Sequence, residues 1–316
     1  MNPKDNLPAQ IDASYDRLAA RESELWGQAK GDLPISWFDS PLIYRYINLR
    51  ISGHPDVDCL DYFKQSYLDA PLPLCLTVGC GHGELERLLI QRGIADQVHG
   101  FDISSQAVES AREQAEAAGL ADRITYFTAD ANRLDQAPLA EQYDAVVVFM
   151  ALHHIAELRA CLEQLRERLR PGGWLLANEF IGPYRFQWTD AQLDITNRLL
   201  ACLPAELTRN LRKPDEIKRY VERPTLEFME TYMAFESITS HEIVPAMQDL
   251  FEMVESKYYG GGILHLLFEA IMGNYQEERV REHAVIIRLL TAMEGILLDY
   301  GVLQHDHALL LARKPA

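Results

Sequence analysis

Hydrophobic positions along the chain follow two different spacings. Residues 1 to about 72 carry apolar side chains at helical spacing, interrupted by prolines and glycines, which predicts a series of helices. From residue 73 to 182, short apolar runs such as LCLTV at 74–78 and YDAVVVF at 143–149 alternate with amphipathic segments. This alternation is typical of a parallel sheet with helices on both faces.

The alternation stops after residue 182. The next stretch, to about residue 248, is predicted to form helices and loops with repeated prolines. We then expect a strand at 250–259, a long helical stretch at 263–300 and a final strand at 307–314.

The first apolar run ends in three glycines at alternate positions, Gly79, Gly81 and Gly83, and the second strand ends at Asp102. Glycine allows a sharp turn and a close approach of the backbone to a ligand. An acid at the end of the second strand can accept hydrogen bonds from both hydroxyls of a ribose. The pattern predicts a site for a nucleoside-containing ligand. A nicotinamide dinucleotide is disfavoured, because its fingerprint needs a glycine where this chain has Glu84.

Charge and cysteine content narrow the function. The formal net charge of -17 argues against nucleic acid or an anionic membrane as a partner and favours a small molecule or a segment of another protein. The five cysteines are scattered without a CxxC pair or a Cys/His cluster, so neither disulfides nor a metal site are predicted. The N-terminus has no apolar signal core, and no apolar run reaches membrane-spanning length, so we expect a cytoplasmic protein. The oligomeric state is left open.

Five segments in order resemble the class I S-adenosylmethionine-dependent methyltransferases: LTVGCGHGELE, HGFDIS, FTADANRL, YDAVVVFMALHHI and LRPGGWLLANEF. The resemblance implies an α/β fold, the Rossmann-like methyltransferase fold, with a doubly wound, mainly parallel seven-stranded sheet whose last two strands are an antiparallel pair. The expected parts are a helical N-terminal lid (1–72), a cofactor-binding core (73–182), a helical cap insertion (183–248), and the C-terminal strands of the core with a helical insertion (249–316).

The resemblance also implies which residues bind the cofactor, S-adenosyl-L-methionine. An ionised carboxylate only accepts hydrogen bonds, which suits a pair of hydroxyls or an exocyclic amine. Asp102 would therefore bind the ribose and Asp130 the adenine amino group, although Asp130 could equally cap a turn or a helix. The other expected cofactor residues are Gly79, Cys80, Gly81 and Gly83 around the methionine part and the ribose, Ile103 and Ala131 beside the adenine, and Phe149 and Met150 near the sulfonium.

Candidate catalytic residues follow the fourth and fifth strands. His153 and His154 lie where this family often places a base, and a histidine can take a proton from a hydroxyl or an amine. The alternative is that His153 packs against the cofactor and His154 caps the next helix. Glu179 could bind an ammonium group or act as a base, or it could be an exposed carboxylate at a strand end. The expected contacts to the acceptor are Tyr44 and Tyr46 of the lid, and Tyr184 and Arg185 after the fifth strand.

These patterns favour a methyltransferase that acts on a small-molecule acceptor, in secondary or glycan metabolism. Two alternatives stay open. The first is an enzyme that cyclises the aminobutyrate part of S-adenosylmethionine to azetidine-2-carboxylic acid and releases methylthioadenosine. The second is a non-catalytic module that only binds the cofactor. All three share the same adenosine site, so the sequence does not separate them.

Overall fold

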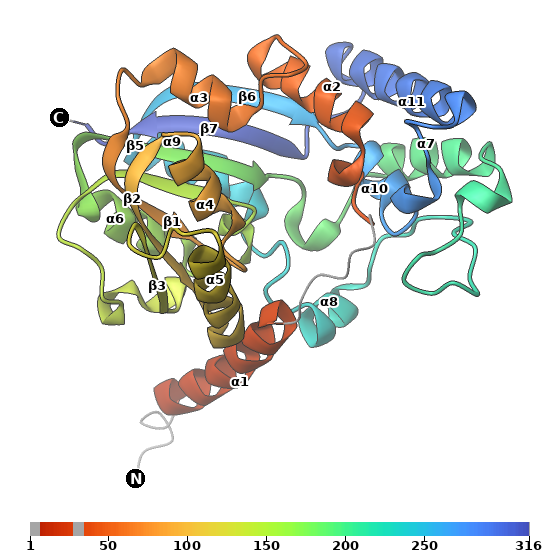
Figure 1. Cartoon of the computed structure of the whole chain (residues 1–316). Coiled ribbons are helices and arrows are strands. Elements are labelled where there is room, and N and C mark those ends of the chain that lie inside the picture. The colour runs from red at the N-terminus through yellow and green to blue at the C-terminus, as the bar shows by residue number, and fades with distance from the viewer. Residues whose placement is uncertain (1–6, 28–34, 316) are drawn as a thin grey trace.

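The computed structural model describes residues 7–27 and 35–315; residues 1–6 and 28–34 of the expected lid lie outside the described residues. A seven-stranded sheet in the order β3–β2–β1–β4–β5–β7–β6 forms its centre (Figure 1). Strands β1 to β5 are parallel, and β7 runs antiparallel to both β5 and β6. The predicted fold class is confirmed, including the two last strands. The strands are β1 (Leu72–Val78), β2 (Ala95–Asp102), β3 (Ile124–Thr128), β4 (Tyr143–Phe149), β5 (Leu169–Phe180), β6 (Glu252–Gly260) and β7 (His307–Arg313).

Both faces of the sheet are apolar, because consecutive residues of a strand point to opposite sides. Cys75 packs in one hydrophobic cluster and Leu76 in the other, and Val147 and Val148 divide in the same way. The first cluster is covered by α2 (Pro41–Ser52), α3 (Cys59–Tyr67), α4 (Glu84–Gln91) and α5 (Ser105–Ala117). The second is covered by α6 (Leu158–Arg168) and α9 (Ile243–Leu250).

The remaining helices are α1 (Leu7–Gly27), α7 (Asp190–Ala201), α8 (Leu226–Tyr232), α10 (Leu264–Phe268) and α11 (Arg281–Asp299). Helices α7, α10 and α11 add buried residues to the first cluster, and α1 contacts α5. The stretch predicted as one long helical segment at 263–300 is interrupted between α10 and α11. The domain boundaries stay a prediction, although α9, which crosses the expected end of the cap at residue 248, packs on α6 of the core.

Helix α1 connects the core to the cap. Arg21 donates hydrogen bonds to the carbonyl oxygens of Thr231 and Tyr232 in α8, and Figure 1 shows the two helices side by side. On the core side, Tyr15 of the same helix donates to Asp130 at 2.6 Å. The helix therefore spans the opening between the two parts.

Glu86 is a buried carboxyl beneath the first strand. It accepts a hydrogen bond from the hydroxyl of Thr77, and both side chains are fully buried. Burial raises the pKa of Glu86 from 4.5 to about 7. The folded state therefore binds this proton more tightly than the unfolded chain, so the group lowers the free energy of unfolding as the pH rises from about 4.5 to about 7.

We expect Glu86→Gln to increase the free energy of unfolding at pH 8 by an amount on the order of 3 kcal/mol, because a buried charge is no longer formed. The decrease of this free energy between pH 5 and pH 7 should also become smaller. Thermal melts across this pH range measure the effect. Glu84→Gln, an exposed position on the same helix, is the matched control. If the stability of Glu86→Gln changed with pH as much as that of the unsubstituted protein, a raised pKa of Glu86 would be contradicted.

Candidate functional site

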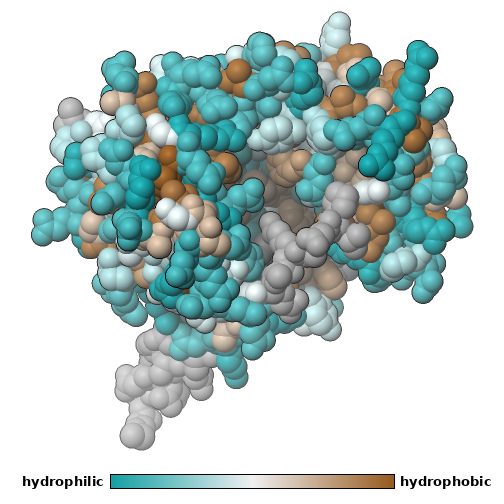
Figure 2. Space-filling model, viewed as in Figure 1, coloured by the Kyte–Doolittle hydropathy of each residue, from teal (hydrophilic) through white to brown (hydrophobic). Residues whose placement is uncertain are grey.

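A cavity of about 1260 Å³ lies at the carboxyl ends of the parallel strands and continues under the lid and cap. Figure 2 shows a hollow near the centre of this face of the molecule. One part of its lining comes from the loops after β1 to β4 and contains predicted cofactor residues: Gly79, Cys80, Gly81, Asp102, Ile103, Asp130, Ala131, Phe149 and Met150. The other part contains the histidine pair with residues of the lid, the loop at 233–242, α10 and β7: Tyr15, Glu22, Trp37, Phe38, Tyr44, His153, His154, Phe235, Glu236, His265 and His307.

The three glycines of the first turn have different structural roles. A Cβ at Gly79 would lie 2.6 Å from the Cβ of Ala151, so the turns after β1 and β4 need this glycine to approach each other. A Cβ at Gly81 would meet no protein atom within 4 Å, and its φ of +49° also favours glycine. Open space beside a glycine of the cavity wall fits the close approach of a ligand.

Gly83 does not belong to the cavity lining, which differs from the prediction. A Cβ there would lie 2.5 Å from the hydroxyl oxygen of Tyr126 and 2.8 Å from the Cβ of Ala111. This glycine is needed because β3 and α5 pack against the start of α4. Packing within the protein therefore explains why position 83 is a glycine, and this glycine is not evidence of a bound ligand.

Asp102 lies at the end of β2 with 8% of its surface exposed, inside the cavity. Its Oδ2 accepts a hydrogen bond from the backbone N–H of Gly81 at 2.9 Å, and Oδ1 accepts from the N–H of Ser104 at 2.9 Å. These bonds fix the carboxylate and leave further lone pairs on both oxygens. Asp102 therefore offers only hydrogen-bond acceptors to the cavity, which fits the two ribose hydroxyls of S-adenosylmethionine.

Asp130 has two partners from the protein itself. Its Oδ1 accepts from the backbone N–H of Asn132 at 2.9 Å and so caps a short 3-10 helix (Ala131–Gln136), the alternative role considered above. Its Oδ2 accepts from the hydroxyl of Tyr15 at 2.6 Å. An adenine amino group that binds this oxygen would have to share it with the Tyr15 hydroxyl or displace that hydroxyl. Helix α1 therefore contributes a competing donor to the predicted adenine site.

Glu179 is fully buried and lies behind the cavity wall, so it is neither an exposed carboxylate nor a group that faces a ligand. Its Oε1 accepts from the backbone N–H groups of Ala151 at 2.7 Å and Leu152 at 2.8 Å. Its Oε2 lies 2.8 Å from Nδ1 of His153. Burial raises the pKa of Glu179 to about 7. The expected role as a base or an ammonium ligand is therefore corrected, because this carboxyl orients His153.

The backbone at Met150 makes this arrangement possible. Met150 adopts a φ of +55°, which is rare for a residue with a side chain, and its N–H donates to the carbonyl oxygen of Asn178 at 2.8 Å. The turn directs the next two N–H groups at Glu179. Strained backbone of this kind is concentrated at functional sites.

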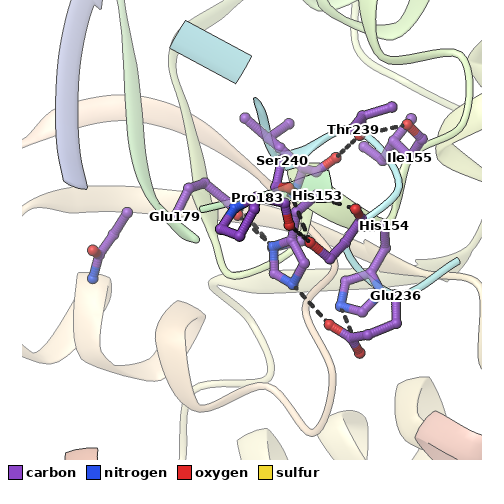
Figure 3. A network of polar contacts seen from close by, with 12 residues as sticks. His153, His154, Ile155, Glu179, Pro183, Glu236, Thr239 and Ser240 are labelled. Atoms are coloured by element: carbon purple, nitrogen blue, oxygen red, sulfur yellow. Dashed lines mark hydrogen bonds and ion pairs between the residues drawn. The ribbon is translucent and has the colours of Figure 1, made fainter. Parts of the chain in front are cut away.

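The two histidines and Glu236 form a cluster on the cavity side (Figure 3). Nε2 of His153 lies 3.6 Å from one oxygen of Glu236, and Nε2 of His154 lies 4.0 Å from the other. Burial lowers the pKa of His153 and lowers that of His154 to about 3, so both imidazoles are neutral at pH 7. His154 is not the cap of the next helix, since the N-cap position of α6 is Glu157.

Glu236 was not found from the sequence, because it lies in an irregular loop without a motif. The structure shows how that loop is held. The N–H of Ile238 donates to the carbonyl oxygen of His153 at 3.0 Å, and the hydroxyl of Thr239 donates to the carbonyl oxygens of Leu152 and Ile155. These long-range bonds place Glu236 opposite the histidines.

The structure brings only one of the four predicted acceptor contacts to the cavity, namely Tyr44. Tyr46 lies beside Gly295 of α11, outside the lining. Tyr184 and Arg185 also lie outside it, where Nε of Arg185 donates to the hydroxyl of Tyr184 at 3.0 Å. Helical spacing and proximity in sequence did not show on which side the chain passes, so the sequence did not predict that these three residues lie outside the lining. Their role as acceptor contacts stays a prediction.

Comparisons with known proteins agree with the fold. The family described as "Methyltransferase domain" matches residues 75–173. The chain is 30% identical over 175 residues to a ubiquinone biosynthesis O-methyltransferase of Cereibacter sphaeroides, over 54% of this chain and 63% of that protein. It is 29% identical over 182 residues to a 27-O-demethylrifamycin SV methyltransferase of Amycolatopsis mediterranei, over 55% and 59%.

A third relative, a 2-phytyl-1,4-naphtoquinone methyltransferase of Trichormus variabilis, is 30% identical over 123 residues, 39% of this chain and 53% of that protein. The matches span less than two thirds of the length of each of these relatives.

Proposed function

Since residues 75–173 form a class I S-adenosylmethionine-dependent methyltransferase domain, with S-adenosyl-L-methionine as its cofactor, we propose that this chain transfers a methyl group to a hydroxyl oxygen of a small molecule. One observation carries the proposal: a single cavity contains both the predicted cofactor residues and a histidine held by a buried carboxyl. A hydroxyl acceptor keeps its proton at neutral pH, so its methylation is assisted by a group that takes this proton.

The bound cofactor supplies a methyl carbon made electrophilic by a sulfonium. Asp102 and the backbone at Gly81 would hold its ribose, as their geometry allows. Glu179 accepts the Nδ1–H of His153, so the lone pair of this imidazole lies on Nε2, on the cavity side. Nε2 would take the hydroxyl proton while the acceptor oxygen bonds to the methyl carbon and the carbon–sulfur bond breaks, with adenosylhomocysteine as the leaving group. Positioning within the cavity supplies much of the remaining acceleration.

The lining around the histidines indicates the acceptor class. Trp37 and Phe38 lie against His307, with ring centroids 5.0 and 5.7 Å away, and all three line the cavity. Such a wall favours a planar, largely apolar molecule that carries a hydroxyl group, as in secondary metabolism. The names of the relatives, which include a quinone-pathway O-methyltransferase and a rifamycin methyltransferase, support this class. Within residues 7–27 and 35–315, no helix is long and apolar enough to cross a membrane.

The test is to incubate the purified protein with S-adenosylmethionine, first alone and then with a panel of phenols and hydroxylated polyketides. Mass spectrometry should show adenosylhomocysteine and a methylated acceptor only when an acceptor is present. Enzyme-dependent methylthioadenosine from the cofactor alone would contradict the proposal and favour the cyclase. Cofactor binding without consumption by any acceptor would favour the non-catalytic module.

A further inference from the structure

We propose that His153, His154 and Glu236 form a binding site for a divalent transition-metal ion in the acceptor part of the cavity. One potential ligand atom from each residue lies within 4.8 Å of the others. The sequence did not predict a metal site, because the third ligand comes from a loop far along the chain. Figure 3 shows both imidazoles directed at the carboxylate of Glu236.

The distances favour an ion between these groups. The two Nε2 atoms lie 3.6 and 4.0 Å from the oxygens of Glu236, which is too long for a hydrogen bond. Two ligands bound at about 2.0–2.1 Å in a tetrahedral site are separated by about 3.4 Å. The three ligand atoms here lie within 4.8 Å of one another, so the side chains would have to move closer together when an ion binds. An ionised Glu179 can only accept, so Nδ1 of His153 then donates to it and Nε2 presents a lone pair to a carboxylate oxygen of Glu236. Two facing lone pairs repel each other, whereas a cation between them attracts both.

Further carboxyl groups face the other ring nitrogens. Nδ1 of His153 lies 2.8 Å from Glu179, and Nδ1 of His154 lies 3.5 Å from Glu22 of α1. Carboxylates that bind the far nitrogen of a metal-ligating histidine fix its orientation and strengthen it as a ligand. When they are ionised, the three carboxyl groups around the two imidazoles form a local negative field that a divalent ion would balance.

The ligand set indicates the kind of ion. Two imidazole nitrogens and one carboxylate suit Zn²⁺, Fe²⁺, Co²⁺ or Ni²⁺, whereas Mg²⁺ and Ca²⁺ prefer oxygen ligands. Three protein ligands leave a coordination position open. We place the acceptor oxygen at that position, where the ion would lower the pKa of its hydroxyl group. While the ion is bound, Nε2 of His153 is its ligand, and the proton-accepting role proposed above belongs to the ion-free protein. This role of the ion rests on the proposed function, but binding of the ion does not.

The experiment is a titration of the purified, chelator-treated full chain with Co²⁺, followed by its visible absorption, and a parallel calorimetric titration with Zn²⁺. We expect stoichiometric binding by the unsubstituted protein. Glu236→Gln, which keeps the shape of the side chain, should weaken binding at least tenfold, and so should Glu179→Gln through His153. The matched control is His241→Ala, because Nε2 of this exposed histidine also lies 3.6 Å from a glutamate oxygen, that of Glu242. Its binding should be unchanged.

Thermal melts and cofactor affinity establish that each variant is folded. Failure of the unsubstituted protein to bind Co²⁺ and Zn²⁺, or equal binding by Glu236→Gln, would overturn the site. Full methyl transfer by chelator-treated protein would overturn the role of the ion and leave the proposed function intact. Binding that depends on Glu236, together with no methyl transfer to any acceptor, would support the site and count against the proposed function.

Discussion

His153→Ala is expected to lower kcat for methyl transfer by about 100-fold or more, the usual contribution of a positioned proton-transfer group. The variant removes the Nε2 atom on the cavity side and leaves Glu179 without the ring that it orients. Affinity for S-adenosylmethionine should change little, since Asp102 and Gly81 lie at the other part of the cavity lining. Steady-state kinetics give kcat, and calorimetry gives the cofactor affinity.

His54→Ala is the control for this prediction, because His54 is exposed and lies outside the cavity lining. Its kcat should equal that of the unsubstituted protein. A folded His153→Ala variant that binds cofactor normally and retains its kcat would show that the acceptor is activated without this histidine.

Asp102→Ala should weaken binding of S-adenosylmethionine at least tenfold, about 1.4 kcal/mol. The substitution removes the carboxylate expected to accept from the ribose hydroxyls and also frees the N–H groups of Gly81 and Ser104. Loss of these two bonds loosens the turn that Gly81 forms, so the effect combines a lost ligand contact with a less ordered site. Isothermal titration calorimetry with S-adenosylmethionine measures it.

Asp102→Asn separates the two contributions, because the amide keeps one acceptor oxygen and nearly the same shape. We expect an affinity between those of Asp102→Ala and the unsubstituted protein. Asp122→Ala, at an exposed position near the end of the sheet, is the control and should bind normally. Equal affinities for all four proteins would disprove the assignment of the cofactor site.

The fold could be predicted from the sequence because its information is local. Each parallel strand is a short apolar run, and the strand ends carry recognisable residues such as the three glycines and Asp102. The five motifs also follow one another in order. Asp102 reaches the cavity for the same reason, since it ends β2 and all parallel strands end at one edge. The break between α10 and α11 was missed, because both parts keep an apolar helical spacing.

The site was harder to predict, because its contacts join distant segments. Glu236 is placed by backbone bonds from its loop to the turn after β4, and no local pattern encodes them. Gly83 has the sequence context of a cofactor glycine but is required by Tyr126. Glu179 lies at a strand end, where a carboxylate that faces the ligand or the solvent was expected, yet the turn at Met150 closes over it. In each case tertiary packing decides the role of the residue.

The most direct test of the central claim follows the methyl group itself. S-adenosylmethionine with an isotopically labelled methyl group is incubated with the protein and a hydroxylated acceptor, and the products are identified by mass spectrometry and NMR. The account predicts that the label appears on the acceptor oxygen, with adenosylhomocysteine as the second product. Label that stays in methylthioadenosine, or that appears on carbon, would contradict it.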